Sequence, residues 1–318
     1  MRYHQLTSEE RYALSVLRKQ GLNNCQIARE LGRHRSTIGR EIERNARKDG
    51  GYRPNKADEY ARARRWRSRR NWHFTDQDFA LVREKLLELW SPEQIAGRLR
   101  AQRKLRISHE TIYRYVWNDW LRGGTLRSCL RSYQKNCRKR YGSYELRGRV
   151  EGKRPISERP AAANTRSRFG HLEGDTVMGG PDQHCIMVLV DRKSRYVWIG
   201  KMRNRTARAA TRCTNRLIRG AERRVHTLTL DNGTEFHDYK DIEEAVDISV
   251  YFATPHHSWE RGTCENTNGL IRQYLPKRSS MAHVTQRDCE RIAHRLNGRP
   301  RKRLNFKTPA EVYEKGIS

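Results

Sequence analysis

Apolar residues recur at helical spacing through the first third of the chain, which predicts a series of short helices. The pair Thr7 and Glu10 has the spacing of a capping box and begins a helix that Gly21 ends. A second helix forms around Ile27, and a third covers residues 35–45. Three short helices in this order are typical of a helix-turn-helix unit.

The third of these helices has an apolar and a polar side. Ile38 and Ile42 face inward, which leaves polar side chains exposed near the N-terminal end of the helix, where they can reach base edges in a major groove. The predicted DNA contacts are Arg33, His34, Arg35, Ser36, Thr37 and Arg40. A small helical bundle with a solvated polar face is the alternative, and periodicity alone does not separate the two.

A similar pattern returns after an amphipathic helix near residues 77–90. Ser91, Pro92 and Gln94 combine an N-cap, a proline in the first turn and a reciprocal side chain. A further helix starts after a second cap, and its exposed N-terminal side predicts more DNA contacts. These are Ser108, His109, Thr111 and Arg114.

Two basic segments flank this second unit. Residues 61–70, ARARRWRSRR, place arginines around Trp66, which suits either phosphate contacts or a solvated helix surface with the tryptophan packed inward. Residues 119–165 are rich in Arg, Lys, Gly and Ser and are interpreted as a basic linker carrying some helix.

The pattern changes to short β-rich runs from residue 168 onward. Three successive strands predict an antiparallel meander, and two more strands follow, each with a helix before it. The strands are expected at 172–178, 185–190, 196–199, 225–230 and 249–253, with helices at 206–222 and 238–245. This order matches a ribonuclease-H-like mixed sheet.

Three carboxylates fall where that order brings them together. Asp175 lies within the first strand, Asp231 directly follows the fourth, and Glu265 lies on the helix after the fifth. Taken singly, Asp231 before Asn-Gly is a turn residue, and the other two are surface charges. Taken together, they predict a magnesium site for phosphodiester chemistry, because two Mg²⁺ ions about 3.5 to 4 Å apart stabilise both the attacking and the leaving oxygen.

Charge supports a nucleic-acid partner. The 318 residues carry 67 Lys and Arg against 36 Asp and Glu, a formal net charge of +31, and such an excess favours a polyanion. Residues 1–150 hold 36 basic and 16 acidic side chains, or +20, which leaves +11 for the remainder. We therefore expect the N-terminal half to be the main DNA anchor.

Other classes are disfavoured. The apolar run from Cys185 to Val190 is too short to cross a membrane, and the polar start lacks a signal peptide's apolar segment, so a cytoplasmic, nucleoid-associated protein is expected. The seven cysteines form no Cys-x-x-Cys pair, which indicates reduced, mostly packed thiols rather than zinc or disulfide sites. No phosphate loop is present, so no nucleotide cofactor is expected.

Several segments resemble the catalytic blocks of the IS-thirty family of bacterial insertion-sequence transposases. They are HLEGDTV at 171–177, TLDNGTEF at 229–236 and YFATPHHSWERGTCENTNGLIRQYLPK at 251–277. The 33 residues between Asp231 and Glu265 match that family's spacing, and the paired helix-turn-helix units and NFKTPAEVY at 305–313 extend the resemblance over nearly the whole chain. Cys264 departs from the polar residue expected before the glutamate.

The resemblance implies that Asp175, Asp231 and Glu265 are the catalytic and metal-binding triad of a DDE transposase of the retroviral-integrase superfamily, with Mg²⁺ or Mn²⁺, two ions, as cofactor. It implies cleavage at terminal inverted repeats and strand transfer into target DNA. Because two element ends must be held together, we expect at least a homodimer.

Other side chains compete for these roles. Glu173 projects from the same strand face as Asp175 and is the best alternative ligand, whereas Asp191 and Glu235 are interpreted as turn or surface residues. His256 and His257 are either DNA contacts or loop residues without a function. Four polar residues on or near the helix of Glu265 are further candidates for contacts with the DNA backbone. They are Arg261, Asn268, Arg272 and Lys277.

The predicted fold class is α+β and multidomain, with N-terminal helical helix-turn-helix units followed by a ribonuclease-H-like mixed α/β catalytic domain. The expected domains are a first helix-turn-helix domain at 1–60, a second at 61–118, the basic linker at 119–165 and the catalytic domain with C-terminal helices at 166–318. Two rivals stay open: a DNA-binding regulator that has lost catalysis, and a nuclease without strand transfer.

Overall fold

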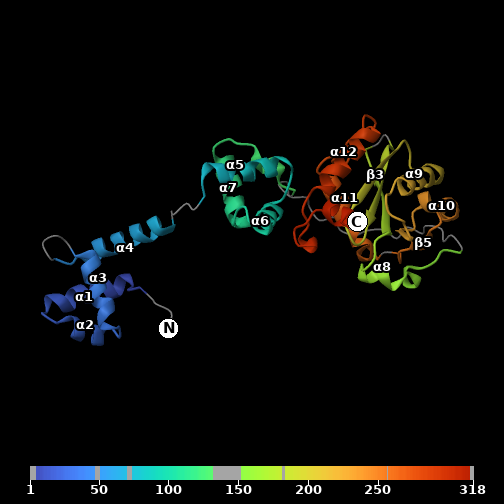
Figure 1. The fold of residues 1–318 in the computed structure, drawn as a ribbon. Coiled ribbons are helices and arrows are strands. Elements are labelled where there is room, and N and C mark those ends of the chain that lie inside the picture. Colours follow the sequence, from blue (N-terminus) through green and yellow to red (C-terminus); the bar gives the residue numbers. More distant parts are fainter. Residues whose placement is uncertain are drawn as a thin grey trace. The chain divides into compact units, whose positions relative to one another are not determined.

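The computed structural model describes residues 5–46, 51–69, 74–131, 152–180, 183–255 and 257–315. The chain divides into two units, Met1–Thr75 and Asp76–Ser318, and Figure 1 follows its elements in order. Among the described residues, no helix has both the length and the apolar character that a bilayer crossing requires. Their six cysteines are free thiols, five of them buried, as the sequence predicts; Cys137 lies outside the described residues.

The first unit contains the predicted helix-turn-helix with one more helix. Its elements are α1 (Ser8–Lys19), α2 (Asn24–Glu30), α3 (Arg35–Asn45) and α4 (Pro54–Arg69). Thr7 and Glu10 form the capping box of α1, and Asn23 caps α2. Leu14, Ile27 and Ile38 are buried at its centre.

A buried arginine joins three of these helices. Arg11 of α1 is 1% exposed and donates to Glu41 of α3 at 2.6 Å and to Asp58 of α4 at 2.9 Å. The Tyr52 hydroxyl also donates to Glu41, at 3.2 Å, and burial raises the pKa of Tyr52. Because α4 contacts α1 and α3 and runs unbroken through residue 60, it belongs to the first unit, which differs from the expected boundary at 60/61.

The second unit begins with a helical group that corresponds to the second expected helix-turn-helix. It comprises α5 (Asp76–Leu87), α6 (Pro92–Ala101), α7 (His109–Leu121) and the short η1 (Leu126–Cys129). Ser91 and Gln94 form the capping box of α6, and Ser108 caps α7, as predicted. Side chains link α6 to the C-terminal segment: Arg98 donates to Glu311 at 2.9 Å, and Lys302 pairs with Glu93 at 2.6 Å.

A five-stranded mixed sheet follows, in the order β3-β2-β1-β4-β5. The strands are β1 (His171–Met178), β2 (Cys185–Asp191), β3 (Val197–Met202), β4 (Thr227–Leu230) and β5 (Ser249–Phe252). The first three pair antiparallel, whereas β4 pairs parallel with both β1 and β5. This confirms the predicted meander and the predicted neighbourhood of the first and fourth strands.

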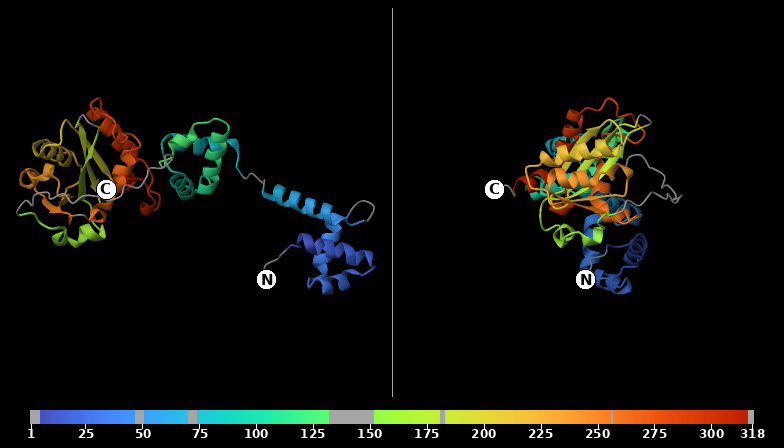
Figure 2. Two further views of the ribbon diagram at one scale, coloured as in Figure 1. Left: turned by 180° about the vertical axis from the view of Figure 1, so that it is seen from behind. Right: turned by 90° about the vertical axis from the view of Figure 1, so that its right-hand side faces the viewer.

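Helices cover both faces of the sheet (Figure 1 and Figure 2). On one face lie α9 (Ala207–Arg219) and α10 (Tyr239–Val246), and on the other lie α11 (Gly262–Ile271) and α12 (Gln286–Asn297). Every residue of β2 is buried, as a central strand between two helical layers requires. Short elements complete the unit: η2 (Ile156–Glu158), α8 (Ala161–Thr165), η3 (Thr234–Phe236), η4 (Ser258–Arg261), η5 (Lys302–Leu304) and α13 (Pro309–Glu314).

The end of the expected basic linker packs onto this sheet. The backbone N–H of Phe252 donates to the carbonyl of Arg154 at 2.9 Å, and the Arg159 guanidinium donates to Thr229 at 3.1 Å. Residues 152–165 therefore extend the sheet domain, which starts before the expected residue 166. At the other end, α7 runs past the expected linker start at 119.

A buried carboxylate fixes α11 to β1. Glu173 on β1 is 0% exposed and accepts hydrogen bonds from the backbone N–H groups of Thr263 at 3.0 Å and Cys264 at 2.9 Å. These N–H groups belong to the first turn of α11, where backbone N–H groups have no hydrogen-bond partners within the helix. A negative charge near this end of a helix is also favourable. Arg192 pairs with the same carboxylate. Glu173 is thus a cap for α11 from another element.

We predict that Arg11→Ala destabilises the first unit by about 3–5 kcal/mol, because it leaves two carboxylates without their buried partner. The matched control is Arg62→Ala, since Arg62 also pairs with Asp58 but its side chain is 75% exposed, and such surface pairs contribute about 0–1 kcal/mol. Urea unfolding of both variants measures the difference. Equal effects would refute a structural role for the Arg11 network.

Glu173→Gln is predicted to lower the stability of the second unit by about 3 kcal/mol, because Arg192 would be left buried without a counter-charge. Asp247→Asn serves as the control, because it breaks the exposed pair with Arg224 and should change stability by no more than about 0.5 kcal/mol. Thermal denaturation compares the two. A Glu173→Gln protein as stable as the control contradicts the assignment of Glu173 as an anchor.

Candidate active site and DNA-binding surfaces

Two of the three predicted carboxylates lie side by side just beyond the point where the pairing of β1 with β4 ends. Glu173 is level with Thr229 in the parallel register of these strands, so Asp175, two residues on, lies level with the position of Asp231 just after β4. Both carboxylates contact the guanidinium of Arg261, Asp175 at 3.6 Å and Asp231 at 3.3 Å. The convergence comes directly from the parallel pairing of the two strands.

Arg261 supplies the positive charge between the two acids. Burial raises the pKa of Asp175, and the nearby charge of Asp231 adds to the rise, while Arg261 opposes it. Burial lowers the pKa of Arg261, but Asp175 and Asp231 outweigh that effect and raise it overall. The guanidinium therefore stands where a cation is needed to keep two neighbouring carboxylates ionised.

One side of α11 and its preceding turn follows β1. Arg261 donates to the carbonyl of Gly174 at 3.2 Å, Asn268 to the carboxylate of Asp175 at 2.8 Å, and Arg272 to the carbonyl of Met178 at 2.8 Å. Glu265 lies between Arg261 and Asn268 at helical spacing, and its side chain is exposed. The third predicted carboxylate is thus on the helix side that borders the other two.

The side chains of the three carboxylates do not converge closely enough to form a three-ligand metal site. Within the described residues, no group of three or more His, Cys, Asp and Glu side chains lies close enough to hold a metal ion. The structure brings Asp175 and Asp231 together through Arg261 and leaves Glu265 exposed beside them.

The donors at this edge fit a hard divalent cation. Asp175 and Asp231 supply carboxylate oxygens, which Mg²⁺ prefers. The amide oxygen Oδ1 of Asn268 is buried and has no hydrogen-bond partner, although its amide group donates to Asp175. An unsatisfied buried oxygen next to two carboxylates is suited to accept a cation or a water that hydrates one.

The remaining acids near the site have structural partners. Glu173, predicted as the best alternative ligand, is wholly occupied by Arg192 and the start of α11, so that hypothesis is corrected. Asp191 was predicted to be a turn or surface residue, but it is the buried last residue of β2 and accepts from the backbone N–H groups of Gly170 and Ser194.

Glu235 was predicted to be a turn or surface residue, and the surface part of that interpretation is wrong. It lies in η3, only 1% exposed, where it accepts from the Thr176 hydroxyl at 2.8 Å and pairs with Arg205 at 2.6 Å. Thr176 follows Asp175 directly, so Glu235 ties the segment after Asp231 to the strand that carries Asp175. The distant partner Arg205 left no signal in the local sequence.

Cys264 stands where the family resemblance leads us to expect a polar residue, and it lies near the acids, since after burial Glu173 and Asp175 add to the rise in the pKa of its thiol. It is fully buried in the apolar layer between α11 and the sheet, where burial raises the pKa of its thiol well above the ordinary range. Cys264 therefore contributes a small buried side chain to the core between α11 and the sheet.

The polar end of α3 is divided between structural and free side chains. Arg33 pairs with Glu10 at 2.8 Å, and the imidazole of His34 accepts from the N–H of Ser36 as the cap of α3. Arg35 and Arg40 are exposed. Of the six predicted contacts, Arg33, His34 and Ser36 therefore have roles within the protein, and Arg35, Thr37 and Arg40 remain as candidates for base or phosphate contacts.

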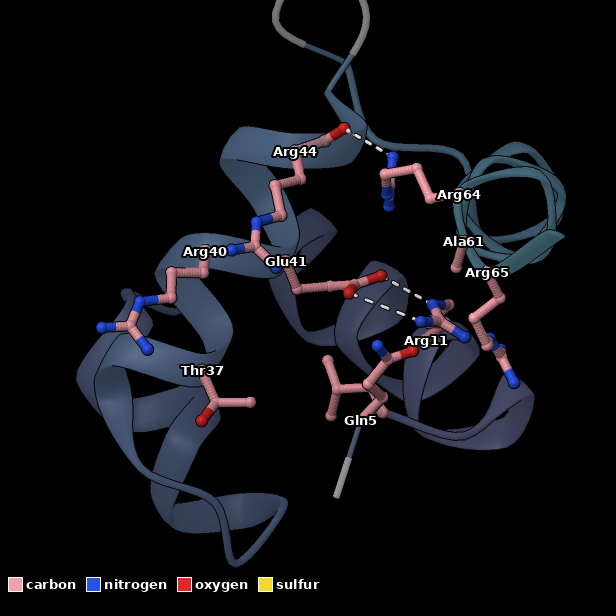
Figure 3. A pocket seen from close by; sticks show the side chains of 10 residues that line it. Gln5, Arg11, Thr37, Arg40, Glu41, Arg44, Ala61, Arg64 and Arg65 are labelled. Carbon is pink, nitrogen blue, oxygen red and sulfur yellow. Dashed lines mark hydrogen bonds and ion pairs between the residues drawn. The ribbon is translucent and has the colours of Figure 1, made fainter. Parts of the chain in front are cut away.

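Arginines also border a pocket between α3 and α4 (Figure 3). Arg40 and Arg44 come from α3, and Arg64 and Arg65 come from α4. Arg64 donates to Asn45 at 2.6 Å, whereas the floor is formed by Arg11 and Glu41, whose charges offset each other (Figure 3). Arg64 and Arg65 of α4 thus lie beside α3. The two predicted roles of 61–70, phosphate contacts and a solvated helix surface, both stay predictions, and the side chain of Trp66 lies outside the described residues.

At α7 the hydroxyls of Ser108 and Thr111 are joined at 2.9 Å and complete the helix cap. His109 and Arg114 are exposed and remain candidates for DNA contacts.

Among the residues predicted to touch DNA near Glu265, Arg261, Asn268 and Arg272 bind protein atoms as described above. Lys277 is exposed, and His256 lies outside the described residues.

Family models match two parts of the chain. A model described as a helix-turn-helix domain matches residues 2–45, and one described as an integrase core domain matches residues 166–258. A likeness to the catalytic core domain of BIV integrase covers 46% of this chain and 95% of that chain at 19% identity. Its TM-score of 0.37 is too low to support an argument.

Relatives match along the full length. The transposase for insertion sequence element IS4351 of Bacteroides fragilis is 38% identical over 98% of this chain and 96% of its own. The transposase for IS1086 of Cupriavidus metallidurans is 37% identical, over 98% and 94%. Transposase InsI for IS30A of Escherichia coli is 38% identical, over 98% and 84%. The chain belongs to this family of insertion-sequence transposases.

Proposed function

We propose that this protein cuts DNA at the ends of an insertion sequence and joins those ends to target DNA, with Asp175, Asp231 and Glu265 holding divalent cations. The observation that carries the proposal is the meeting of Asp175 and Asp231 at one guanidinium. Two carboxylates from distant parts of the chain rarely share a site unless a positive charge is to be bound there.

Mg²⁺ or Mn²⁺, as two ions, would stabilise charge on the attacking and leaving oxygens of a phosphodiester. The chain itself holds the Asp175 carboxylate in place through Asn268 and through the adjoining N–H of Thr176, which donates at 2.9 Å. Glu265, exposed on α11, would complete the ligand set. Arg261, once a cation neutralises the two aspartates, is available to a DNA phosphate.

The reaction has two displacements at phosphorus. Water attacks the phosphodiester at the element end, the bond to the 3′ oxygen breaks, and a free 3′ hydroxyl remains on the element. That hydroxyl then attacks a target phosphodiester, forms a new bond and releases a target 3′ hydroxyl. In the first step a water oxygen replaces a 3′ oxygen on phosphorus, and in the second step one 3′ oxygen replaces another. Neither step consumes a nucleotide.

The helical units supply recognition of the terminal inverted repeats. Exposed Arg35 and Arg40 on α3, and His109 and Arg114 on α7, are suited to contact base edges and phosphates. We further propose that the protein acts as at least a homodimer, because two element ends must be joined together, and that it works at the nucleoid in the bacterial cytoplasm.

Two alternative functions, a nuclease and a DNA-binding regulator, give different products from a transposase in one assay. Pre-cut element ends are mixed with a plasmid target and Mg²⁺. Joined products support transposition, cleavage without joining supports a nuclease, and neither product supports a DNA-binding regulator that has lost catalysis.

We expect Asp175→Asn, Asp231→Asn and Glu265→Gln each to reduce strand transfer by at least about a thousandfold, as loss of a central electrostatic group does, with end binding nearly unchanged. Asp241→Asn and Glu244→Gln, on the exposed side of α10, are matched controls that keep activity. Retained strand transfer in any one triad variant removes that residue from the site.

In the first unit, Arg40→Ala is expected to weaken binding to the terminal repeat by about tenfold, in line with about 1–3 kcal/mol for a base contact. Lys19→Ala, an exposed charge in the last turn of α1, is the control. Gel-shift titrations at one fixed salt concentration compare the two. If both variants bind like the unchanged protein, α3 does not present Arg40 to DNA.

A further inference from the structure

A second charged feature lies on the other flank of α11. A groove there is lined by Gly262, Thr263 and Asn266 of α11 and by cationic side chains from several separate segments. The cations are Arg131, Arg166, Arg195, Arg301, Lys302 and Arg303. Glu93 is the acid among the lining residues, and it is paired with Lys302 at 2.6 Å.

The charges in this groove repel one another. Burial lowers the pKa of Arg195 to about 10, and Arg166 and Arg303 contribute to the fall. Burial likewise lowers the pKa of Arg301 to about 9, with contributions from Arg299 and Arg195. The nearby carboxylate of Glu173 acts in the opposite sense on Arg195, but it is already paired with Arg192.

A buried guanidinium adjoins this cluster. Arg299 is 1% exposed and donates to Gln273 at 2.8 Å, yet its Nε and Nη2 atoms have no hydrogen-bond partner. After burial, Arg299 contributes to the lowered pKa of Arg301, so this cation adds to the positive potential behind the groove. An accumulation of partly unsatisfied cations is suited to a ligand with several negative charges.

Some of the arginines are held in place and others are available. Arg195 donates to the hydroxyl of Thr263 at 2.7 Å, and Arg301 donates to the carbonyl of Leu296 at 3.1 Å. Within the described part of the chain, the side chains of Arg166 and Arg303 make no hydrogen bond, and Arg303 is exposed. A groove with fixed cations and free ones beside them can bind successive phosphates.

The groove and the acidic edge share α11 as a common wall. Gly262 and Asn266, which line the groove, are the sequence neighbours of Arg261 and Glu265, which border the carboxylates. Trp259 also lines the groove, and its side chain is 69% exposed and stacked on His257. An exposed indole offers a stacking surface for a base or sugar.

We infer that this groove binds the sugar-phosphate backbone of DNA that passes over α11 next to the carboxylates. The inference rests on the proposed function for the identity of the polyanion as DNA. It adds a binding site separate from the helix-turn-helix units, and it gives Arg166 and Arg303 the role of phosphate contacts. Each such contact releases counterions, so it can be counted from the salt dependence of binding.

The test compares Arg166→Gln/Arg303→Gln with Arg208→Gln/Arg212→Gln in the full-length protein. The control pair removes the same charge from exposed positions on α9, which covers the opposite face of the sheet. Fluorescence anisotropy with a short duplex lacking the terminal repeat, in EDTA over a range of KCl concentrations, gives the slope of log Kd against log[KCl].

We expect the groove variant to reduce this slope by nearly 2, at about 0.9 per lost phosphate contact, while the control keeps the slope of the unchanged protein. The single change Arg303→Gln, at an exposed position, should reduce it by about half as much and guards against misfolding of the double variant. Equal slopes for the groove variants and the control overturn the inference. So does a change in oligomeric state without a change in slope, because the groove would then hold another copy of the chain.

The position of the contact is tested with an element-end duplex ethylated at single phosphates. Ethylation next to the cleaved bond should weaken binding by the unchanged protein and should no longer weaken binding by the groove variant. An ethylation pattern that is identical for both proteins contradicts the inference. Because these readouts require neither a metal ion nor chemistry, an inactive triad would not alter them, and failure of the proposed function is recognised separately by the strand-transfer assay.

Discussion

The placement of α11 against β1 governs the arrangement of every charged group near the carboxylates. Glu173 binds the first turn of this helix and Arg192, whereas Arg272 binds the far end of β1. With both ends held, the helix lies along the strand, and the residues between them fall next to Asp175. The buried cap thus does more than stabilise a helix end, since it also fixes the helix next to the strand that carries Asp175.

Charge is separated across this one helix. On the side toward β1 there are two aspartates with Arg261 between them, and on the other side there are arginines without matching acids. Such an arrangement has a physical logic for an enzyme acting on phosphodiesters: the acids need cations in order to approach a phosphate, and the arginines attract the phosphates on either side of the reacting one. If the proposed function holds, the arginines on one flank of α11 would attract DNA, and the carboxylates on the other flank would act on the reacting bond.

Much of this was accessible from the sequence. The strand order, the caps at Thr7, Ser91 and Ser108 and the convergence of Asp175 with Asp231 follow from short-range patterns and from the pairing rules of a mixed sheet. The roles of Glu173, Glu235 and Arg11 were not predictable, because each depends on a partner that is remote in the sequence and that appears there as an ordinary charged residue. A buried ion pair has no local signature. The extent of α4 was missed for a related reason, since its arginine-rich half gives little hydrophobic periodicity.

Arg261 has a consequence for the protein when no metal is bound. Without Arg261, Asp175 and Asp231 would face each other as like charges with no cationic side chain between them, which is unfavourable. A guanidinium stays protonated under all physiological conditions, so this internal counter-ion offsets one of the two negative charges, while burial still raises the pKa of Asp175. The two aspartates therefore already hold a cationic side chain, and any ion that bound between them would have to displace it.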